Sequence, residues 1–541
     1  MPLRPSVSRH KKFLLLFCAL CYLYFRGVGD HGLFDPLEGL NASVSLNMAS
    51  RGEPFYPMAG ELPFAGSTLG FWWLNALSLC AFGWSEFATR FFPACAALLI
   101  AVAAAVMARP EGRRAAYYAA LVSGTTLLSF LPSQLSSVHT LYAALMGLAL
   151  TGFVRGRGDP RFRPLAHAGA ILALVVYGPA GFLLPWLTLF LYSQLVDDPD
   201  SVLPFLLNRP GLFITAGIGL GYLLLLKVKN PVMLSLLGYL PSSTTLLPFL
   251  PVMMTGFFPW CGYLLQAFVS ACPRSMDDLL NPEGPRLFLL LWTTVFAFSA
   301  LLSEDALALT ACLPSLAVLT ALYMDESVTR NTVEGAQRAT ALNLLLTTFL
   351  LAGGLPLLFS LYPELGVAFS SLLVWVFFSL LFLFASWYYA RTKQLVKLWR
   401  HTGLIALLSL LPLAGAFDLV AEATSLRSVG LYLRGELKKG EVVVQYAMNR
   451  PSLFFYTAHD SVLTAAAPLP DIQGQRSLGD PELHRLWKET ARVYLLIDRD
   501  QPLSSPLPES VSDVYRSGRL LLLSNRSHAV PVQAAPVLPT P

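Results

Sequence analysis

Charged residues are scarce in this sequence. Only 13% of its 541 residues are Asp, Glu, Lys or Arg, whereas 55% are hydrophobic. Soluble globular chains carry about a quarter charged residues, so the composition excludes that class, and the large hydrophobic share excludes a disordered chain. The composition therefore indicates a protein that crosses a membrane several times.

Cysteine and clustered basic residues are also sparse. Seven cysteines, none of them after Cys312, exclude a secreted disulfide scaffold. The close pair Cys18 and Cys21 lies inside an apolar run, where thiols behave as ordinary apolar side chains. No run of Lys and Arg is long enough to indicate nucleic acid as a partner. The apolar run Phe13–Phe25 resembles a signal peptide, but no small-residue cleavage site follows it, so we expect a retained helix.

The apolar segments indicate about thirteen membrane spans, the first at Phe13–Phe25 and the last at Leu404–Phe417, since a helix needs about 20 residues to cross a bilayer. With the N-terminus inside, about twenty Lys and Arg fall on cytoplasmic segments and about five on the opposite loops. An odd number of spans then places the C-terminus outside. We therefore predict an all-α polytopic membrane bundle, N-terminus in and C-terminus out, formed by residues 1–420.

Two regions are expected outside the membrane. Residues 27–84 form a first outer loop, in which we expect juxtamembrane helices, and residues 421–528 form a small C-terminal α/β domain with a helix that begins near Asp480. Short apolar or β-rich runs in this domain occur at 442–446, 452–456, 493–497 and 520–523. The Pro-rich tail, residues 529–541, is expected to be disordered.

Two carboxylates, Asp35 and Glu38, stand three residues apart in the first outer loop. A pair of carboxylates beside a membrane surface can act as a general base or bind a cation. The same spacing is typical of a helix N-terminus in which Asp35 caps the helix and Glu38 completes a capping box. Composition alone favours the capping interpretation.

Motifs in this loop and beyond it resemble a known family. The motifs are Asp35-Pro36-Leu37-Glu38-Gly39, Met48, Gly52-Glu53, Trp72-Trp73, Ala81 to Arg90 with Pro93, Tyr177-Gly178-Pro179, Pro259-Trp260 and Asn449 to Tyr456. In their order they resemble the lipid-linked-sugar glycosyltransferases of the GT-C type, which include protein mannosyltransferases and the aminoarabinose transferase of lipid A. The resemblance covers nearly the whole chain and is most specific in the first loop.

Several positions depart from the family pattern. The family's first-loop acid falls on Leu37, its Glu-Lys pair on Gly66 and Ser67, its acid at the start of the fourth span on His139, and its Lys before Gly-Pro on Tyr177. The family chemistry requires a carboxylate that takes the proton of the acceptor hydroxyl, and cationic or metal groups that offset the charge of the departing phosphate. Groups with these functions are therefore reduced in number here.

The resemblance still implies a set of site residues. Glu38, with Asp35 nearby, remains as a base, and His139 can accept a proton because its ordinary pKa is close to neutral. The alternative for His139 is a structural histidine that binds a loop carbonyl at the membrane interface. The residues expected to bind substrate or phosphate are Arg51, Lys227, Lys229 and Tyr177. No metal ligands and no certain cofactor are predicted, although a divalent metal is compatible with this chemistry.

The sequence thus predicts an integral membrane glycosyltransferase that moves a hexosyl or pentosyl group from a polyprenyl-phosphate carrier to a lipid or polysaccharide acceptor. Its expected location is the bacterial inner membrane, with the C-terminal domain in the periplasm, and its other expected partners are membrane lipids. The changed positions favour an alternative, a catalytically inactive relative that binds or assembles lipid-linked glycans. A transporter is the third possibility, with less support, because few ionisable residues lie in the spans and no inverted repeat is visible.

Overall fold

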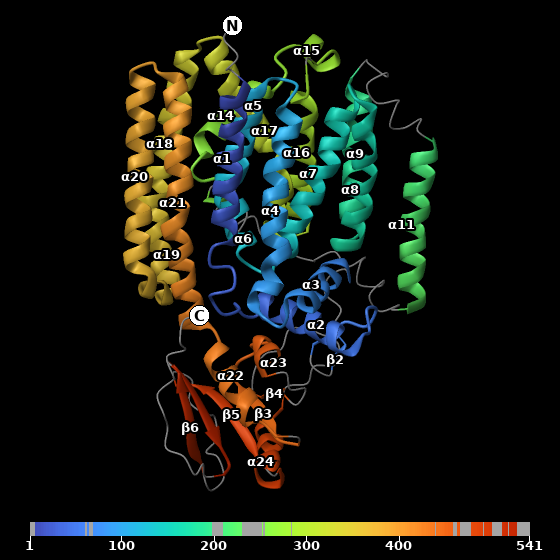
Figure 1. Cartoon of the computed structure of the whole chain (residues 1–541), viewed down its shortest axis with the longest axis vertical. Helices are drawn as coiled ribbons and strands as arrows, with labels where there is room; N and C mark the ends of the chain where they lie inside the picture. The colour runs from blue at the N-terminus through green and yellow to red at the C-terminus, as the bar shows by residue number, and fades with distance from the viewer. Residues whose placement is uncertain are drawn as a thin grey trace. The chain divides into compact units, whose positions relative to one another are not determined.

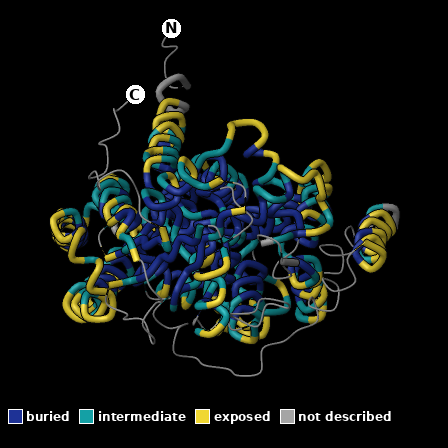
Figure 2. The backbone as a smooth tube through the Cα atoms, turned by 90° about the horizontal axis from the view of Figure 1, so that it is seen from below, coloured by how far each residue is buried: buried dark blue, intermediate teal, exposed yellow. Residues whose placement is uncertain are grey.

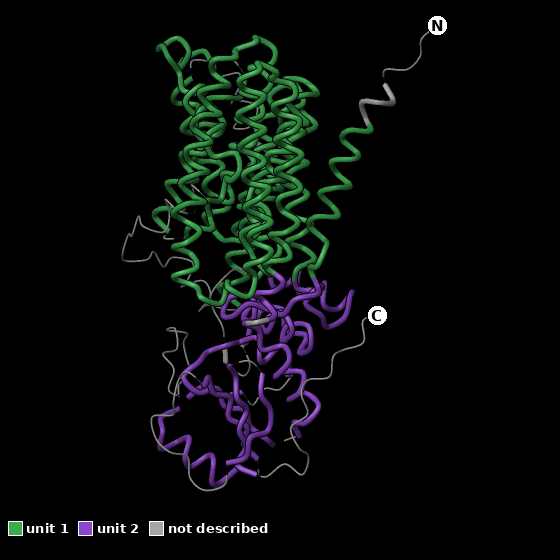
Figure 3. Tube along the Cα trace, turned by 90° about the vertical axis from the view of Figure 1, so that its left-hand side faces the viewer, with its two compact units in different colours: residues 1–28, 67–71, 90–417 green, residues 29–66, 72–89, 418–541 purple. Residues whose placement is uncertain are grey.

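The protein divides into two compact units. The computed structural model describes residues 6–59, 62–63, 69–196, 209–229, 252, 255–282, 284–303, 305–438, 440–457, 462–465, 478–490, 492–499, 511–517 and 519–526. Unit 1 consists of Met1–Val28, Ser67–Phe71 and Arg90–Phe417, and unit 2 of Gly29–Gly66, Trp72–Thr89 and Asp418–Pro541 (Figure 3). The first outer loop is therefore grouped with the C-terminal residues.

Unit 1 is built from helices (Figure 1). Those of its first half are α1 (Ser6–Phe25), α4 (Glu86–Ala108), α5 (Arg113–Thr125), α6 (Leu127–Ser133), α7 (Val138–Gly156), η1 (Pro160–Phe162), α8 (Arg163–Val176), α9 (Pro179–Leu195) and α11 (Arg209–Lys229). Those of its second half are α14 (Cys261–Ala271), α15 (Met276–Leu280), α16 (Arg286–Leu302), η3 (Ala306–Cys312), α17 (Leu313–Thr329), α18 (Val333–Phe349), η4 (Leu350–Gly354), α19 (Leu355–Leu361), η5 (Pro363–Ala368), α20 (Phe369–Arg391) and α21 (Leu395–Thr424). The first turn of α4 and the last two turns of α21 belong to unit 2.

The predicted polytopic helical bundle is confirmed. Six helical stretches in the described ranges are long and apolar enough to cross a membrane, and the pair α5 and α6, bent by 52°, makes a seventh if it is counted as one span. The six are Glu86–Ala108, Val138–Gly156, Ala306–Thr329, Val333–Leu361, Pro363–Arg391 and Leu395–Glu422. Other apolar helices are shorter than the usual span, such as α8 with 14 residues. The count of about thirteen and the N-in, C-out orientation stay predictions.

Unit 1 exposes a broad apolar surface. Figure 2 shows exposed residues mainly on the outer helices and buried residues mainly at the centre. Large apolar side chains point outward from α18 and α20, including Leu345, Phe349 and Phe377, which are 67%, 73% and 61% exposed. Such a belt of apolar side chains is stable against lipid tails and not in water. The surface therefore fits a membrane-spanning bundle.

Small residues allow α7 and α8 to pack closely. A Cβ atom added at Gly152 would lie 2.1 Å from the backbone nitrogen of Ala166, and one added at Gly169 would lie 2.6 Å from that of Ala149. Interfaces of this kind are common in membrane bundles, because glycine lets two helix backbones approach each other. The contact fixes the start of α7 relative to the end of α8, where two predicted site residues, His139 and Tyr177, lie.

Unit 2 contains a five-stranded mixed sheet. Its elements are α2 (Leu37–Arg51), β1 (Met58–Ala59), β2 (Leu62–Pro63), most of α3 (Leu69–Phe82), α22 (Arg427–Glu436), β3 (Val442–Tyr446), α23 (Ser452–Thr457), β4 (Val462–Ala465), α24 (Asp480–Glu489), β5 (Val493–Asp498), β6 (Ser512–Ser517) and β7 (Leu520–Ser524). The strand order is β4-β3-β5-β7-β6, with β4, β3 and β5 parallel and β7 and β6 antiparallel. The small α/β fold expected for the C-terminal residues is therefore present.

Alternating side chains of the strands cover both faces of this sheet. Val443 and Leu496 pack with α22 residues on one face, whereas Val444 and Leu495 pack with Trp487 of α24 on the other. This follows from the period-2 alternation of strand side chains, which gives each face its own core. A strand with both faces covered is apolar throughout, which explains the continuous apolar runs in the sequence.

One of the expected runs differs from the sequence-based description. Residues 452–456, grouped there with the apolar or β-rich runs, form the short helix α23. The reason is that Asp35 of the first loop accepts a hydrogen bond from the backbone N–H of Ser452, 2.8 Å away, and binds its hydroxyl as well. This carboxylate satisfies a donor of the first turn of α23, as an N-cap side chain does. The predicted tail, residues 529–541, lies outside the described residues, as do Gly66 and Ser67.

Candidate functional site

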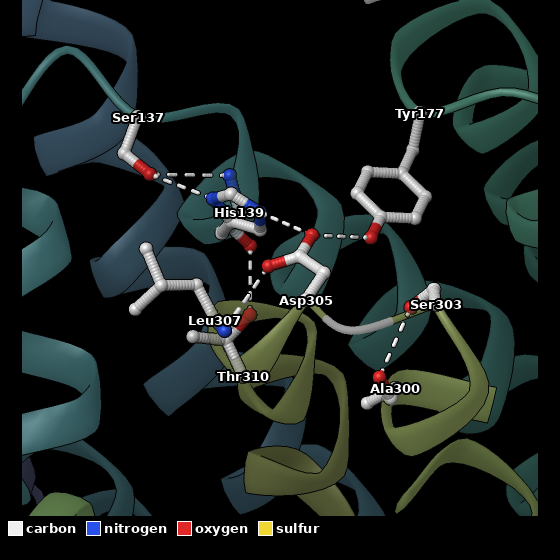
Figure 4. Close-up of polar contacts among 8 residues, drawn as sticks. All are labelled: Ser137, His139, Tyr177, Ala300, Ser303, Asp305, Leu307 and Thr310. Carbon is white, nitrogen blue, oxygen red and sulfur yellow. Dashed lines mark hydrogen bonds and ion pairs between the residues drawn. The ribbon is translucent and has the colours of Figure 1, made fainter. Parts of the chain in front are cut away.

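His139 lies in the first turn of α7 and is held at both ring nitrogens (Figure 4). The Ser137 side chain is the N-cap of α7 and accepts a hydrogen bond from the backbone N–H of His139. The same Oγ atom lies 3.2 Å from Nδ1 of His139, and the Nε2 atom lies 2.8 Å from Oδ2 of Asp305. A hydroxyl from η3, that of Thr310, donates to the His139 carbonyl. His139 is therefore fixed in one orientation, toward Asp305.

Asp305 is the carboxylate at the centre of this cluster. It is the N-cap of η3, and its Oδ1 atom accepts from the backbone N–H of Leu307 at 3.1 Å. Its Oδ2 atom accepts from the Tyr177 hydroxyl at 2.9 Å in addition to facing His139. Burial would raise the pKa of Asp305, but the hydrogen bonds from His139 and Tyr177 outweigh it and hold the pKa below its ordinary value. Asp305 is thus a negatively charged group at neutral pH.

Tyr177 is positioned by the end of α8 and by a neighbouring ring. It is the C-cap residue of α8, and its backbone N–H closes the last turn on the Ala173 carbonyl. Its ring stacks on that of Tyr142, with ring centres 3.8 Å apart and planes 6° from parallel. Stacking fixes the ring plane, so the hydroxyl is directed at the Asp305 carboxylate.

The cluster of Ser137, His139, Tyr177 and Asp305 combines fixed donors with an accessible acceptor. The Asp305 side chain is 32% exposed, whereas that of His139 is only 10% exposed. His139 and Tyr177 donate to this carboxylate with their side chains, and the backbone N–H groups of Leu307 and Ala308 donate to it as well. The exposure of the carboxylate allows Asp305 to contact a bound hydroxyl. Chemically, the cluster can orient a hydroxyl and accept its proton.

The two first-loop carboxylates, in unit 2, have structural partners. Oε2 of the buried Glu38 accepts from the backbone N–H of Phe34 at 2.9 Å, next to the start of α2. Asp35 binds Ser452, as described above. The expected cap of the following helix by Asp35 is therefore wrong, since the N-cap of α2 is Pro36 without a side-chain cap hydrogen bond and Asp35 binds the first residue of α23 instead. Burial raises the pKa of Asp35 to about 6, because it outweighs the hydrogen bonds from Ser452.

The basic residues expected to bind phosphate lie in different places. Lys227 and Lys229 are exposed in the last turn of α11, in unit 1. Arg51 is exposed at the end of α2, in unit 2, with one guanidinium nitrogen 3.3 Å from the sulfur of Met58. Of the predicted site residues, the structure brings together His139 and Tyr177, through Asp305. The roles assigned to the remaining residues stay predictions.

Asp305 belongs to none of the sequence motifs described above. The residue stands between the expected spans 287–302 and 306–323, on the same predicted outer side as His139 and Tyr177. An acid between two apolar spans, at the membrane side that also holds other candidate residues, was therefore a usable signal. Within the described ranges, no group of three or more His, Cys, Asp or Glu side chains is arranged to hold a metal ion.

Comparisons of the sequence with known proteins match only part of the chain. No family model matches the chain. An uncharacterized protein of Aquifex aeolicus is 27% identical over 190 residues, which are 34% of this chain, and the match spans only 38% of that relative's length.

Among solved structures, ArnT from Cupriavidus metallidurans is similar in its apo state, with a TM-score of 0.76, 19% identity, and coverage of 96% of this chain and 98% of that chain. ArnT bound to undecaprenyl phosphate gives the same TM-score and identity, with coverage of 95% and 98%. The Archaeoglobus fulgidus oligosaccharyltransferase in its apo form is 13% identical, with a TM-score of 0.55 and coverage of 92% and 70%. These similarities extend over both units of the chain. The chain thus has the fold of ArnT over nearly its whole length, and it shares that fold more distantly with the oligosaccharyltransferase.

Proposed function

We propose that this protein is an integral membrane glycosyltransferase that moves a sugar from a polyprenyl-phosphate carrier to a lipid or polysaccharide acceptor. The support is a fold shared with ArnT over nearly the whole chain, together with the binding of undecaprenyl phosphate by that relative. The proposed location is the bacterial inner membrane, with unit 2 in the periplasm, as the distribution of Lys and Arg predicts.

One observation carries the enzymatic assignment. The family's acid at the start of the fourth span is replaced by His139, but a carboxylate from another loop, Asp305, lies 2.8 Å from that histidine. The chain therefore keeps a negative charge at this place in the fold, although a different segment supplies it. Asp305 is the proposed base, and His139 and Tyr177 are positioning residues.

In the proposed reaction the acceptor oxygen attacks the anomeric carbon of the donor sugar. The bond from that carbon to the phosphate oxygen breaks, and the polyprenyl phosphate leaves with the bonding electrons. The hydroxyl proton passes to the Asp305 carboxylate, which is kept ionised and oriented by its two side-chain donors. Lys227 and Lys229, in unit 1 like Asp305, are the proposed cationic groups for the phosphate.

The test is sugar transfer by the purified chain in lipid nanodiscs, with a panel of polyprenyl-phosphate sugars and a membrane-lipid extract. Asp305→Asn should lower the rate about 100-fold or more, because it removes the base but keeps the cap of η3. Asp159→Asn is the matched control, since Asp159 is also the N-cap of a 3-10 helix, η1, at the other end of α7. Equal rates in the two variants would exclude Asp305 as the base.

A second candidate function is a catalytically inactive relative that binds lipid-linked glycans. It is favoured by the structural use of both first-loop carboxylates, Asp35 on Ser452 and Glu38 on the Phe34 N–H. Measurable carrier binding with no turnover across the whole panel would support this candidate. Loss of transfer in Glu38→Gln, with the fold retained, would assign a catalytic role to Glu38 and argue against it.

A further inference from the structure

We propose that unit 1 holds an acidic phospholipid in a groove between α1, α4 and α5, at the end of the bundle opposite to His139. The groove has a volume of 640 Å³ and is lined mainly by apolar residues of these three helices. The three helices lie beside one another in Figure 1, and Figure 3 shows the N-terminal part of α1 inclining away from the rest of unit 1. The proposal does not depend on the proposed glycosyl transfer.

The wall of the groove suits hydrocarbon chains. Leu14 and Phe17 of α1 and Val102 of α4 are 62%, 44% and 41% exposed, so large apolar side chains face open space. Opposite them, small residues such as Ala105 and Ala116 leave room between the helices. An apolar groove on a membrane-spanning bundle is filled by lipid tails, because water in it would lack hydrogen-bond partners on most sides.

One end of the groove is strongly basic. Three arginines line it: Arg109 at the end of α4, Arg113 in the first turn of α5, and Arg155 in the last turn of α7. No Asp or Glu is among the lining residues. The nearest acid in sequence, Glu111, lines a neighbouring cavity instead. Three guanidinium groups without a carboxylate beside them favour the binding of an anion, because their positive charges repel one another and an anion would offset them.

Two of these arginines have no side-chain partner among the residues that the structure describes. Arg155 donates to the Val106 carbonyl at 3.3 Å and lies 4.8 Å above the Phe162 ring. By contrast, the side chains of Arg109 and Arg113 form no hydrogen bond or ion pair with any residue that the structure describes. The adjacent Arg114 differs, because it is bound to Asp325 and Thr329. Arg109 and Arg113 are thus available to a phosphate, next to the uncapped N-terminus of α5.

The combination selects one ligand class. A free phosphate would leave the apolar wall unused, and a neutral lipid would leave three positive charges unpaired. A phospholipid with net negative charge satisfies both, with its tails along α1 and its phosphate at the arginines. Along α7, Arg155 lies about 24 Å from His139, so the groove serves the opposite membrane surface from the candidate site. The Lys and Arg distribution predicts that this surface is cytoplasmic.

The test is native mass spectrometry of the full chain in detergent, titrated with phosphatidylglycerol or phosphatidylcholine. We expect one phosphatidylglycerol to bind more tightly than the others and more tightly than phosphatidylcholine. The double variant Arg109→Gln, Arg113→Gln should weaken that first binding step about tenfold or more. The reason is that each basic residue near a membrane surface adds attraction for an anionic lipid, and the variant removes two of them. Arg161→Gln is the matched control, because Arg161 is exposed in the nearby η1 but does not line the groove.

A groove-filling variant keeps the test valid if the double variant folds poorly. Ala105→Phe leaves all charges in place but occupies the apolar wall, so it should also weaken the first binding step. The proposal is overturned if phosphatidylcholine binds as tightly as phosphatidylglycerol, or if Arg161→Gln has the same effect as the double variant. Tighter binding of undecaprenyl phosphate than of phosphatidylglycerol, lost in the same variants, would overturn it too, since the groove would then be a carrier site.

Discussion

The hydroxyl of Tyr177 stabilises the charged form of Asp305 by a single hydrogen bond, which Tyr177→Phe removes. The pKa of Asp305 should then rise, because a donor to the carboxylate is lost. A base of this kind is active when ionised, so the rate falls as the pH drops through its pKa. In the variant, the acid limb of the pH–rate profile should move to higher pH, with little change in rate at high pH.

Tyr142→Phe is the control for this shift. Tyr142 stacks on the Tyr177 ring but donates no hydrogen bond to Asp305 in the described structure. Its acid limb should stay where it is in the unmodified protein. A limb that moves in both variants, or in neither, would contradict the role given to the Tyr177 hydroxyl.

Asp35 should make the stability of unit 2 dependent on pH. Its pKa in the folded protein is about 6, raised by burial above the ordinary 3.8. Between pH 4 and pH 6 the folded form therefore keeps a proton that the unfolded form has lost. This proton binding stabilises the folded form, and the stabilisation is lost as the pH rises through about 6. Between pH 5 and pH 7.5 the free energy of unfolding of the unmodified protein should decrease by about 1 kcal/mol relative to that of Asp35→Asn.

The measurement is the difference in melting temperature between the two proteins at both pH values. Asp513→Asn provides the comparison, since Asp513 is exposed and pairs with Arg516 at the surface. If the difference between unmodified protein and Asp35→Asn is the same at pH 5 and pH 7.5, the carboxyl does not titrate in this range.

Residue types and order explain part of the site but not its geometry. His139 and Tyr177 were found because they occupy motif positions. Their distance from Asp305 depends on how η3 packs against α7, 166 positions away in the sequence. The first-loop carboxylates show the same limit, because the partner of Asp35, Ser452, is 417 positions away. Such long-range pairings leave no local pattern in the sequence.

At the scale of elements, the close contact of α7 and α8 holds His139 and Tyr177 in register. Gly152→Ala should separate the two helices, because its Cβ would meet the backbone of Ala166 at 2.1 Å. Overpacking of this kind costs about 1 to 3 kcal/mol. We expect a lower melting temperature by fluorescence-detected size-exclusion chromatography, together with reduced transfer activity.

Gly217→Ala in α11 is the matched control for this substitution. Nothing lies within 4 Å of a Cβ added there, so only helix propensity changes, in favour of alanine. Its melting temperature should be equal to that of the unmodified protein or higher. The same decrease in both variants would show that the α7–α8 contact tolerates a methyl group.

Most elements follow from local patterns in the sequence. The strands β3, β5 and β7 and the helix α24 begin within a residue of the expected runs, because buried strands are apolar and α24 starts at an Asp-Pro pair. Residues 452–457 are the exception, since their apolar composition fits a strand and their helix depends on a cap from the first loop. Local patterns fail where a distant side chain decides the conformation.

At the scale of the whole molecule, the division into two compact units differs from the linear order of the chain. The sequence predicts a boundary near residue 420, but unit 2 draws on the first loop as well as on the C-terminal residues. A core cluster joins Leu33 and Ala42 of the first loop to Phe455 and Tyr456. Two hydrogen bonds add to it, from Ser43 to the Pro451 carbonyl and from the Leu33 N–H to Tyr456. Composition finds the apolar bundle, whereas this shared core depends on contacts between segments about 400 residues apart.

This shared core predicts that the chain can be cut and still assemble. Residues 1–417 and 418–541, co-expressed with the second fragment directed to the first-loop side of the membrane by a cleavable signal peptide, should purify together. Ala42→Glu should abolish the association, since it buries a charge in the cluster with Phe455 and Tyr456. Leu37→Glu, on the same helix but 50% exposed, should leave it intact. If the fragments fold but separate, or if both variants behave alike, the first loop does not form the core of unit 2.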